Sequence, residues 1–148
     1  MKRKRIVLAL LAVWSASSCA AKSPLDRLLH DLEARVEDRN AEAVVELLAP
    51  DFKAENGMSR AEVQGELKRY FFAYESLDVS LSEIAPSGAP PTHVSLRVDM
   101  EGKVRQVGGL GDLMPGLSAW SFDFDLVTKD GRLLVSAARW TRIDRPQP

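Results

Sequence analysis

The sequence predicts an α+β domain, in which three N-terminal helices pack on the concave face of a curved, mainly antiparallel sheet of about four strands. In the first half of the chain, apolar residues recur every three or four positions, which is typical of amphipathic helices. In the second half they recur at every second position, which is typical of strands with one buried face. Because helical and strand patterns occupy separate halves, they favour α+β over an alternating α/β fold.

Residues 1–18 have the pattern of a signal peptide, with a basic stretch before an apolar segment too short to span a membrane. The letters A-S-S-C that end at Cys19 resemble the lipobox of bacterial lipoproteins, although Ala16 stands where Leu is usual. The resemblance implies a lipidated Cys19 followed by a short tether at 19–23. The alternative is ordinary cleavage after Ala21, which would release a soluble periplasmic protein.

The residue after the cysteine suggests where such an anchor would lie. In Gram-negative lipoproteins, which this segment resembles, an Asp directly after the cysteine marks retention in the inner membrane. Residue 20 is Ala instead, so the resemblance implies an anchor at the periplasmic face of the outer membrane. Several acyl chains on one cysteine would anchor the chain firmly, whereas one chain binds marginally. Cys19 is the only cysteine, so the exported domain has no second thiol with which to form an internal disulfide.

The charge and the length of the chain limit the kind of partner and the number of domains. Four of the 20 Lys and Arg residues lie at positions 2–5, so the chain from Cys19 onward carries 16 basic and 21 acidic residues, a net charge of about −5. An acidic balance argues against a nucleic-acid partner. The remaining 130 or so residues suit one domain, which we place at 24–143, with a disordered tail at 144–148.

Capping residues mark the first two predicted helices. Ser23 precedes Pro24, an order typical of a helix start, and an apolar stripe follows at helical spacing. Asn40 begins a short second helix, which Pro50 is predicted to end. Phe52 follows and is expected to insert into the core.

The third helix has the clearest start. Ser59 and Glu62 have the spacing of a capping box. The apolar face of this helix is predicted to consist of Val63, Leu67, Tyr70, Phe71 and Tyr74.

Strand patterns follow the helices. Residues 77–82 alternate as a strand, and 86–91 is predicted to be a loop. Apolar residues keep even positions across Gly102, so 92–107 is predicted to be one long strand bent at that glycine. The Gly-rich segment 108–116 lacks the spacing of a phosphate loop and is either a mobile apolar loop at a pocket mouth or a plain connection.

The final hairpin, at 118–143, is predicted to form the floor of the core. A two-residue Asp-Gly loop would place Arg139 opposite Phe122, in a row of aromatic side chains. A three-residue loop instead puts Arg139 on the same face as Asp123 and Asp125, and we prefer it for that reason. It pairs Trp120 with Trp140, Phe122 with Ala138, and Phe124 with Ser136.

These features together resemble the nuclear transport factor 2-like superfamily. The resemblance rests on the letters L-L-A-P-D-F at 47–52, the capped third helix, and a final hairpin of the form W-x-F-x-F-x-L…D-G-R…W, and it covers nearly all of 24–143. It implies a cone-shaped α+β fold, which ketosteroid isomerases, polyketide cyclases, scytalone dehydratase and many non-catalytic binding proteins share. The motifs are structural, so they predict the fold and leave the activity open.

Enzymes of this superfamily use cavity-facing Asp, His or Tyr residues as acids and bases. The alternation predicts that Asp123 and Asp125 point outward, where Arg139 is their expected partner. No metal-ligand spacing and no cofactor motif is present, so we expect neither a metal nor a cofactor. The candidate pocket residues are Phe52, Tyr70, Tyr74, Met100, Trp120, Phe122, Phe124, Ser136 and Trp140.

Three functions are consistent with this pattern. The first is a non-catalytic envelope lipoprotein whose cone binds an apolar small molecule or a protein partner. The second is an isomerase- or dehydratase-like enzyme that uses Tyr70 or Tyr74 with an Asp. The third is a structural protein that forms a homodimer through its outer sheet face, where Val127, Leu133, Val135 and Ala137 are predicted to lie.

Overall fold

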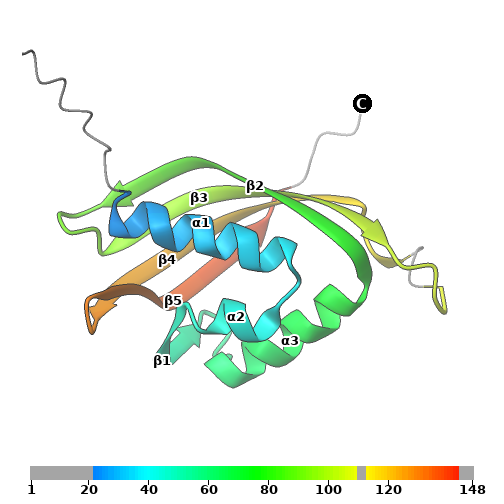
Figure 1. The fold of residues 1–148 in the computed structure, drawn as a ribbon, viewed down its shortest axis with the longest axis horizontal. Helices are drawn as coiled ribbons and strands as arrows, with labels where there is room; N and C mark the ends of the chain where they lie inside the picture. Colours follow the sequence, from blue (N-terminus) through cyan, green and yellow to red (C-terminus); the bar gives the residue numbers. More distant parts are fainter. Residues whose placement is uncertain (1–21, 110–112, 144–148) are drawn as a thin grey trace, which may run out of the picture.

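A computed structural model describes residues 22–109 and 113–143. The predicted signal peptide, the Cys19 lipidation site and the tail at 144–148 lie outside these residues. The structure is a five-stranded, mostly antiparallel sheet with three helices, and α1 crosses one face of the sheet (Figure 1). The α+β prediction is therefore confirmed. Within the described residues, no helix has the length and apolar character that crossing a membrane requires.

The helices begin where their capping residues predict. They are α1 (Pro24–Glu37), α2 (Ala41–Val45) and α3 (Arg60–Phe72). Ser23 accepts a hydrogen bond from the Asp26 backbone, Asn40 caps α2, and the capping box of Ser59 and Glu62 is formed.

The helix ends were predicted less well. Pro50 does not end α2, because α2 stops at Val45. Tyr74 is not on α3, because the strand that follows this helix begins there.

The strands are β1 (Leu48–Ala54), β2 (Tyr74–Ser87), β3 (His93–Val104), β4 (Leu117–Lys129) and β5 (Arg132–Arg142). Their order in the sheet is β1-β5-β4-β3-β2. The strand that the sequence did not predict is β1, which pairs in parallel with β5. It contains Pro50, which an edge strand tolerates because its outer side forms no ladder hydrogen bonds.

The final hairpin combines features of both predicted registers. Lys129 pairs with Arg132 around a two-residue turn, so the predicted three-residue loop is wrong. A bulge then shifts the register between Asp125 and Leu126, opposite Ser136. The observed pairs are Trp120 with Arg142, Phe122 with Trp140, Asp123 with Arg139, and Phe124 with Ala138. The predicted partners are thus wrong, but Phe122 and Phe124 still lie on the opposite face from Asp123, Asp125 and Arg139, whereas Arg142 stands opposite Trp120 at the end of the aromatic face.

Because of the bulge, the predicted composition of the outer face of the sheet is partly wrong. Residues between the turn and the bulge point to the opposite side from the one predicted, so Leu133 and Val135 belong to the core cluster. Two of the four residues proposed for a dimer surface are therefore buried inside the domain. Val127 remains exposed, at 38%.

The long strand bent at Gly102 is confirmed as a single strand, β3. A Cβ built at Gly102 would lie 2.4 Å from the ring of Tyr74, so the glycine allows this tyrosine to pack against the backbone. The glycine at this position therefore has a packing cause.

Two clusters of buried side chains make up the core. The larger joins Leu25, Leu28 and Leu29 of α1 to the sheet. The smaller joins Ala41 and Val44 of α2 to Phe71, Tyr74 and Leu77. Among the described residues, every buried member of both clusters lies between Leu25 and Ala138, so we expect residues 22–148 to fold by themselves.

Candidate functional site

The helix-facing side of the sheet carries the predicted aromatic row. Phe124 is buried at 6% exposure, whereas Phe122, Trp120 and Trp140 pack on the core and are only partly buried. The Phe122 ring lies 5.5 Å from that of Phe124 and 6.1 Å from that of Trp140. This spacing is typical of tilted aromatic pairs. The row therefore runs from the closed core to a side where its rings remain partly open.

The third helix borders the same core with a similarly open face. Phe71 is its only buried residue, and it belongs to the smaller cluster. Val63 and Leu67 pack on the larger cluster but are only partly buried. Met100 of β3 has the same intermediate exposure, and it also lines a hollow of about 180 Å³ along β2 and β3. Helix and sheet thus both present half-covered apolar side chains.

The two candidate tyrosines are structural in this arrangement. Tyr74 is 1% exposed, and its hydroxyl donates a hydrogen bond to the Pro115 carbonyl at 2.8 Å. Burial, followed by the hydrogen bond with Tyr70, raises the pKa of Tyr74 far above its ordinary value. The phenol therefore keeps its proton and is a poor base. The Tyr70 ring lies 5.0 Å away and is half-buried.

The remaining candidates divide between core and bulge. Phe52 is buried at 2% exposure on β1, as predicted. Ser136 sits at the bulge of β5 and is half-buried, so it does not face Phe124.

The outer face of the sheet carries a polar network instead. His93 lies between two carboxylates, with Nδ1 at 3.0 Å from Asp125 and Nε2 at 3.3 Å from Asp123. Ser95 donates a hydrogen bond to Asp123 at 2.6 Å. This bond is the largest cause of the lowered pKa of Asp123, and the charges of His93 and Arg139 add to it. Both carboxylates point outward, as predicted.

His93 and Ser95 were not predicted as partners of these acids. They are two positions apart on β3 and stand opposite Asp125 and Asp123 on β4, so alternation alone could have suggested the network. The Ser95 proton points to a carboxylate rather than to the imidazole, which is not the arrangement of an activated serine. Among the residues that the structure describes, no cluster of His, Cys, Asp or Glu could hold a metal.

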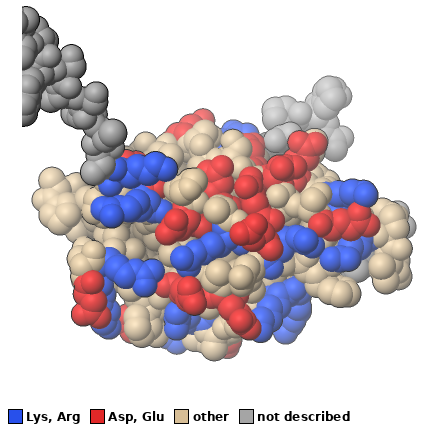
Figure 2. Space-filling model, viewed as in Figure 1, with Lys and Arg blue, Asp and Glu red and all other residues tan. Residues whose placement is uncertain are grey.

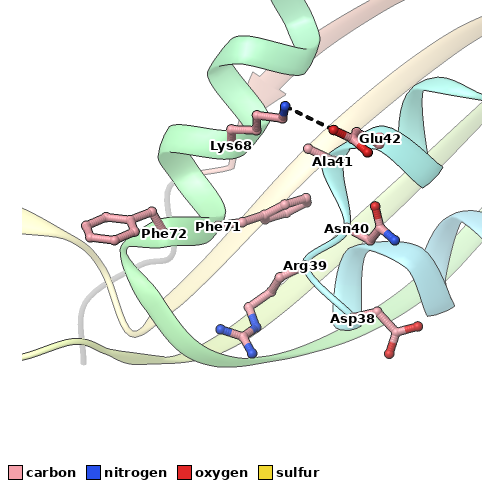
Figure 3. Close-up of a pocket in the computed structure, with 8 residues that line it drawn as sticks. All are labelled: Asp38, Arg39, Asn40, Ala41, Glu42, Lys68, Phe71 and Phe72. Atoms are coloured by element: carbon pink, nitrogen blue, oxygen red, sulfur yellow. Dashed lines mark hydrogen bonds and ion pairs between the residues drawn. The ribbon is translucent and has the colours of Figure 1, made fainter.

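A hollow of about 530 Å³ lies beside the corner between α1 and α2 (Figure 3). It was not predicted. Phe72, which ends α3, is 64% exposed there, whereas Phe71 is buried. Lys68 forms an ion pair with Glu42 at 3.2 Å, and Arg39 donates a hydrogen bond to the Tyr74 carbonyl at 2.8 Å. The lining is Asp38, Arg39, Asn40, Ala41, Glu42, Lys68, Phe71 and Phe72.

Comparison with solved structures identifies the fold. No protein-family model matches the chain, and no curated protein matches its sequence. ActVI-ORFA from Streptomyces coelicolor is similar in structure, with a TM-score of 0.64 at 13% identity over 80% of this chain and 92% of that one. A type 2 hexachlorocyclohexane dehydrochlorinase, LinA, has a TM-score of 0.58 at 13% identity, over 82% of this chain and 87% of that one.

A third structure is a Catenulispora acidiphila protein with a ketosteroid isomerase-like fold, solved with trimethylamine. Its TM-score is 0.57 at 15% identity, over 77% of this chain and 83% of that one. The chain therefore has the nuclear transport factor 2-like, ketosteroid isomerase-like cone fold. This fold is found in binding proteins and in enzymes, so it does not fix the role.

Proposed function

We propose that the protein is a non-catalytic envelope lipoprotein that binds an apolar small molecule or an apolar segment of a protein partner. The proposed binding surface is the helix-facing side of the sheet, which we call the concave face. The observation that carries the proposal is the half-buried row of Trp120, Phe122 and Trp140. Removing such rings from water on binding is favourable by about 25 cal/mol for each Å² of apolar surface covered. Ligand sites are commonly apolar and concave, with few polar groups.

The enzymatic alternative lacks its acid. An isomerase or dehydratase that used Tyr70 or Tyr74 would need a carboxylate near the tyrosine, on the helix-facing side. Asp123 and Asp125 lie on the other side of the sheet, where His93 and Ser95 contact them. No observation favours this alternative.

The two tryptophans of the domain allow a direct test. The chain has three Trp residues, and the third, Trp14, lies in the predicted signal peptide. Excitation of Trp120 and Trp140 should therefore transfer energy to the neutral apolar dye N-phenyl-1-naphthylamine when the dye binds to residues 22–148. We expect saturable transfer that Phe122→Ser weakens at least ~5-fold, since the loss of one aromatic contact costs about 1 kcal/mol or more.

The control variant for this assay is Asp125→Asn, which changes the outer face and should leave dye binding unchanged. Energy transfer that does not saturate, or that Phe122→Ser leaves intact, would contradict the proposed site. Denaturation curves of both variants establish that each is folded at the temperature of the assay.

The membrane anchor needs a separate test. We propose Cys19 as the lipidated residue and the periplasmic face of the outer membrane as the location, based on the A-S-S-C pattern. Labelling in a Gram-negative host with an alkyne analogue of palmitate should mark the protein, and Cys19→Ala should abolish the label. An unlabelled protein that begins at Lys22 would favour ordinary cleavage after Ala21 instead.

A further inference from the structure

We propose that the hollow at the α1–α2 corner binds a small amphipathic carboxylate, with its apolar group on Phe72 and its carboxylate on Arg39. This site is distinct from the concave face, because its floor, Phe71 and Ala41, belongs to the smaller core cluster. The hollow has a volume of about 530 Å³ and is largely open to solvent, so a small ligand would lie against its floor with one side exposed.

Arg39 supplies the charge for this site. One of its five N–H donors binds the Tyr74 carbonyl, and among the described residues it has no ion-pair partner. By contrast, Lys68 in the same hollow is paired with Glu42. A guanidinium with unused donors matches a carboxylate in geometry and charge, and such bonds are stronger than neutral ones.

The backbone of Arg39 points to the same conclusion. Its φ is +54°, in the left-handed region where Gly is the usual residue after a helix. An arginine there costs roughly 1 kcal/mol of backbone strain or more. The hydrogen bond to the Tyr74 carbonyl offsets part of this cost, and the remaining donors of the side chain stay in the hollow.

Acidic groups in the lining limit the kind of ligand. Asp38 and Glu42 balance Arg39 and Lys68, so the hollow has no formal net charge. Figure 3 shows the Asp38 carboxylate pointing away from the Arg39 guanidinium. A ligand with a single anionic group can therefore bind at Arg39 without facing Asp38, whereas a ligand with several anionic groups would meet it.

Phe72 supplies the apolar contact. It is the more exposed of two adjacent aromatic residues, at 64%, although it ends a helix that packs on the domain. The Arg105 guanidinium lies 5.8 Å from its ring centroid, and the Arg105 Nε is buried without a hydrogen-bond partner. The Arg105 guanidinium thus lies against the Phe72 ring, and the exposed remainder of the ring suits an aryl or alkyl group.

The test uses residues 22–148 labelled with ¹⁵N, and 3-phenylpropionate as the probe. Amide shifts at 38–42 and 68–72 should titrate to saturation with a Kd of about 1 mM or tighter. The neutral analogue 3-phenylpropan-1-ol should bind at least ~10-fold more weakly, because it offers no charge to the guanidinium. Equal binding of the acid and the alcohol would overturn the proposal.

Two variants and one control separate the contacts. Phe72→Ser removes an exposed ring and should weaken binding of the acid at least ~10-fold. Arg39→Gln should remove the preference for acid over alcohol, and Arg39→Lys should restore part of it. The control, Arg69→Gln, removes an arginine of α3 that pairs with Glu66 and lies outside the hollow, so binding should not change.

The outcomes distinguish this site from the concave face. Phenylpropionate should not displace N-phenyl-1-naphthylamine from residues 22–148, and Phe122→Ser should not alter phenylpropionate binding. Displacement of the dye together with insensitivity to Phe72→Ser would place the acid on the concave face and overturn this proposal, while leaving the proposed function standing.

Discussion

The two faces of the sheet carry opposite chemistry, although alternate residues of the same strands form them. On β4, Phe122 and Phe124 face the helices. Asp123 and Asp125 face outward, where each forms a hydrogen bond with the β3 residue opposite it, Ser95 and His93 respectively. The first face gains stability from burial, and the second from hydrogen bonds that remain partly in water. The face on which a carboxylate lies therefore decides whether it can take part in chemistry within the cone.

The largest expected effect comes from the buried end of the aromatic row. Phe124→Ala should lower the free energy of unfolding by about 3–5 kcal/mol, because it leaves a cavity in the core. Asp125→Ala, on the next residue but the outer face, should cost less than about 1 kcal/mol. Urea denaturation measures both, and similar losses for the two variants would contradict the division between the faces.

A smaller effect is expected where the sheet meets Tyr74. Gly102→Ala places a Cβ 2.4 Å from a ring that is 1% exposed, so the backbone must shift, at a cost of about 1–3 kcal/mol. Gly65→Ala is the matched control, because a Cβ in the middle of α3 would have no neighbour within 4 Å. That variant should stabilise the protein by about 0.5–1 kcal/mol. Equal changes in the two variants would show that Tyr74 does not require the glycine.

The smallest expected effect is on the pH dependence of stability, through a carboxyl group on the outer face of the sheet. The pKa of Asp123 is lowered, chiefly by the Ser95 hydroxyl. A carboxyl with a lowered folded-state pKa stabilises the fold above its unfolded pKa, and this contribution is lost as pH falls through the folded-state value. Ser95→Ala removes the largest cause, so the pKa should rise toward its ordinary value, and stability should fall less as the pH drops below about 4.

The measurement for this last prediction is a direct NMR titration of the Asp123 carboxyl, with denaturation curves at each pH. Ser121→Ala, on the same face but outside the network, is the control. An unchanged Asp123 titration in Ser95→Ala would mean that His93 or Arg139 sets the pKa instead.

The fold could be predicted because strict alternation determines which face a side chain occupies. Val94, Leu96 and Phe124 lie in the core, as their even positions predict. The residue pairs of the hairpin could not be predicted, because the position of a bulge depends on local backbone geometry. In the sequence, the bulge appears only as a switch of the core-facing residues of β5 from odd positions, such as Val135, to even positions, such as Ala138. The strand β1 was missed because Pro50 resembles a helix stop when its parallel partner is unknown.

The candidate site was predicted in part for the same reason. The aromatic row follows from alternation within one strand. The hollow instead joins 38–42 to Lys68, Phe71 and Phe72 of α3, and no pattern within either segment shows that they meet. One local sign was available. The first helix ends without a glycine, and Arg39 adopts the left-handed conformation that a glycine commonly supplies at this position.

The end of α1 also has a consequence for the long outermost strand, β2. An unpaired strand edge invites a second chain to add to it and begin a fibre. Here Glu37 accepts a hydrogen bond from the Val79 amide at 3.0 Å, and Arg39 donates one to the Tyr74 carbonyl. Farther along, Glu83 has a φ of +52°, and the register shifts between Ser82 and Ala85. Mixed charge covers the side of the molecule shown in Figure 2. A neighbouring copy in a crowded compartment thus meets an irregular edge with some of its sites already occupied.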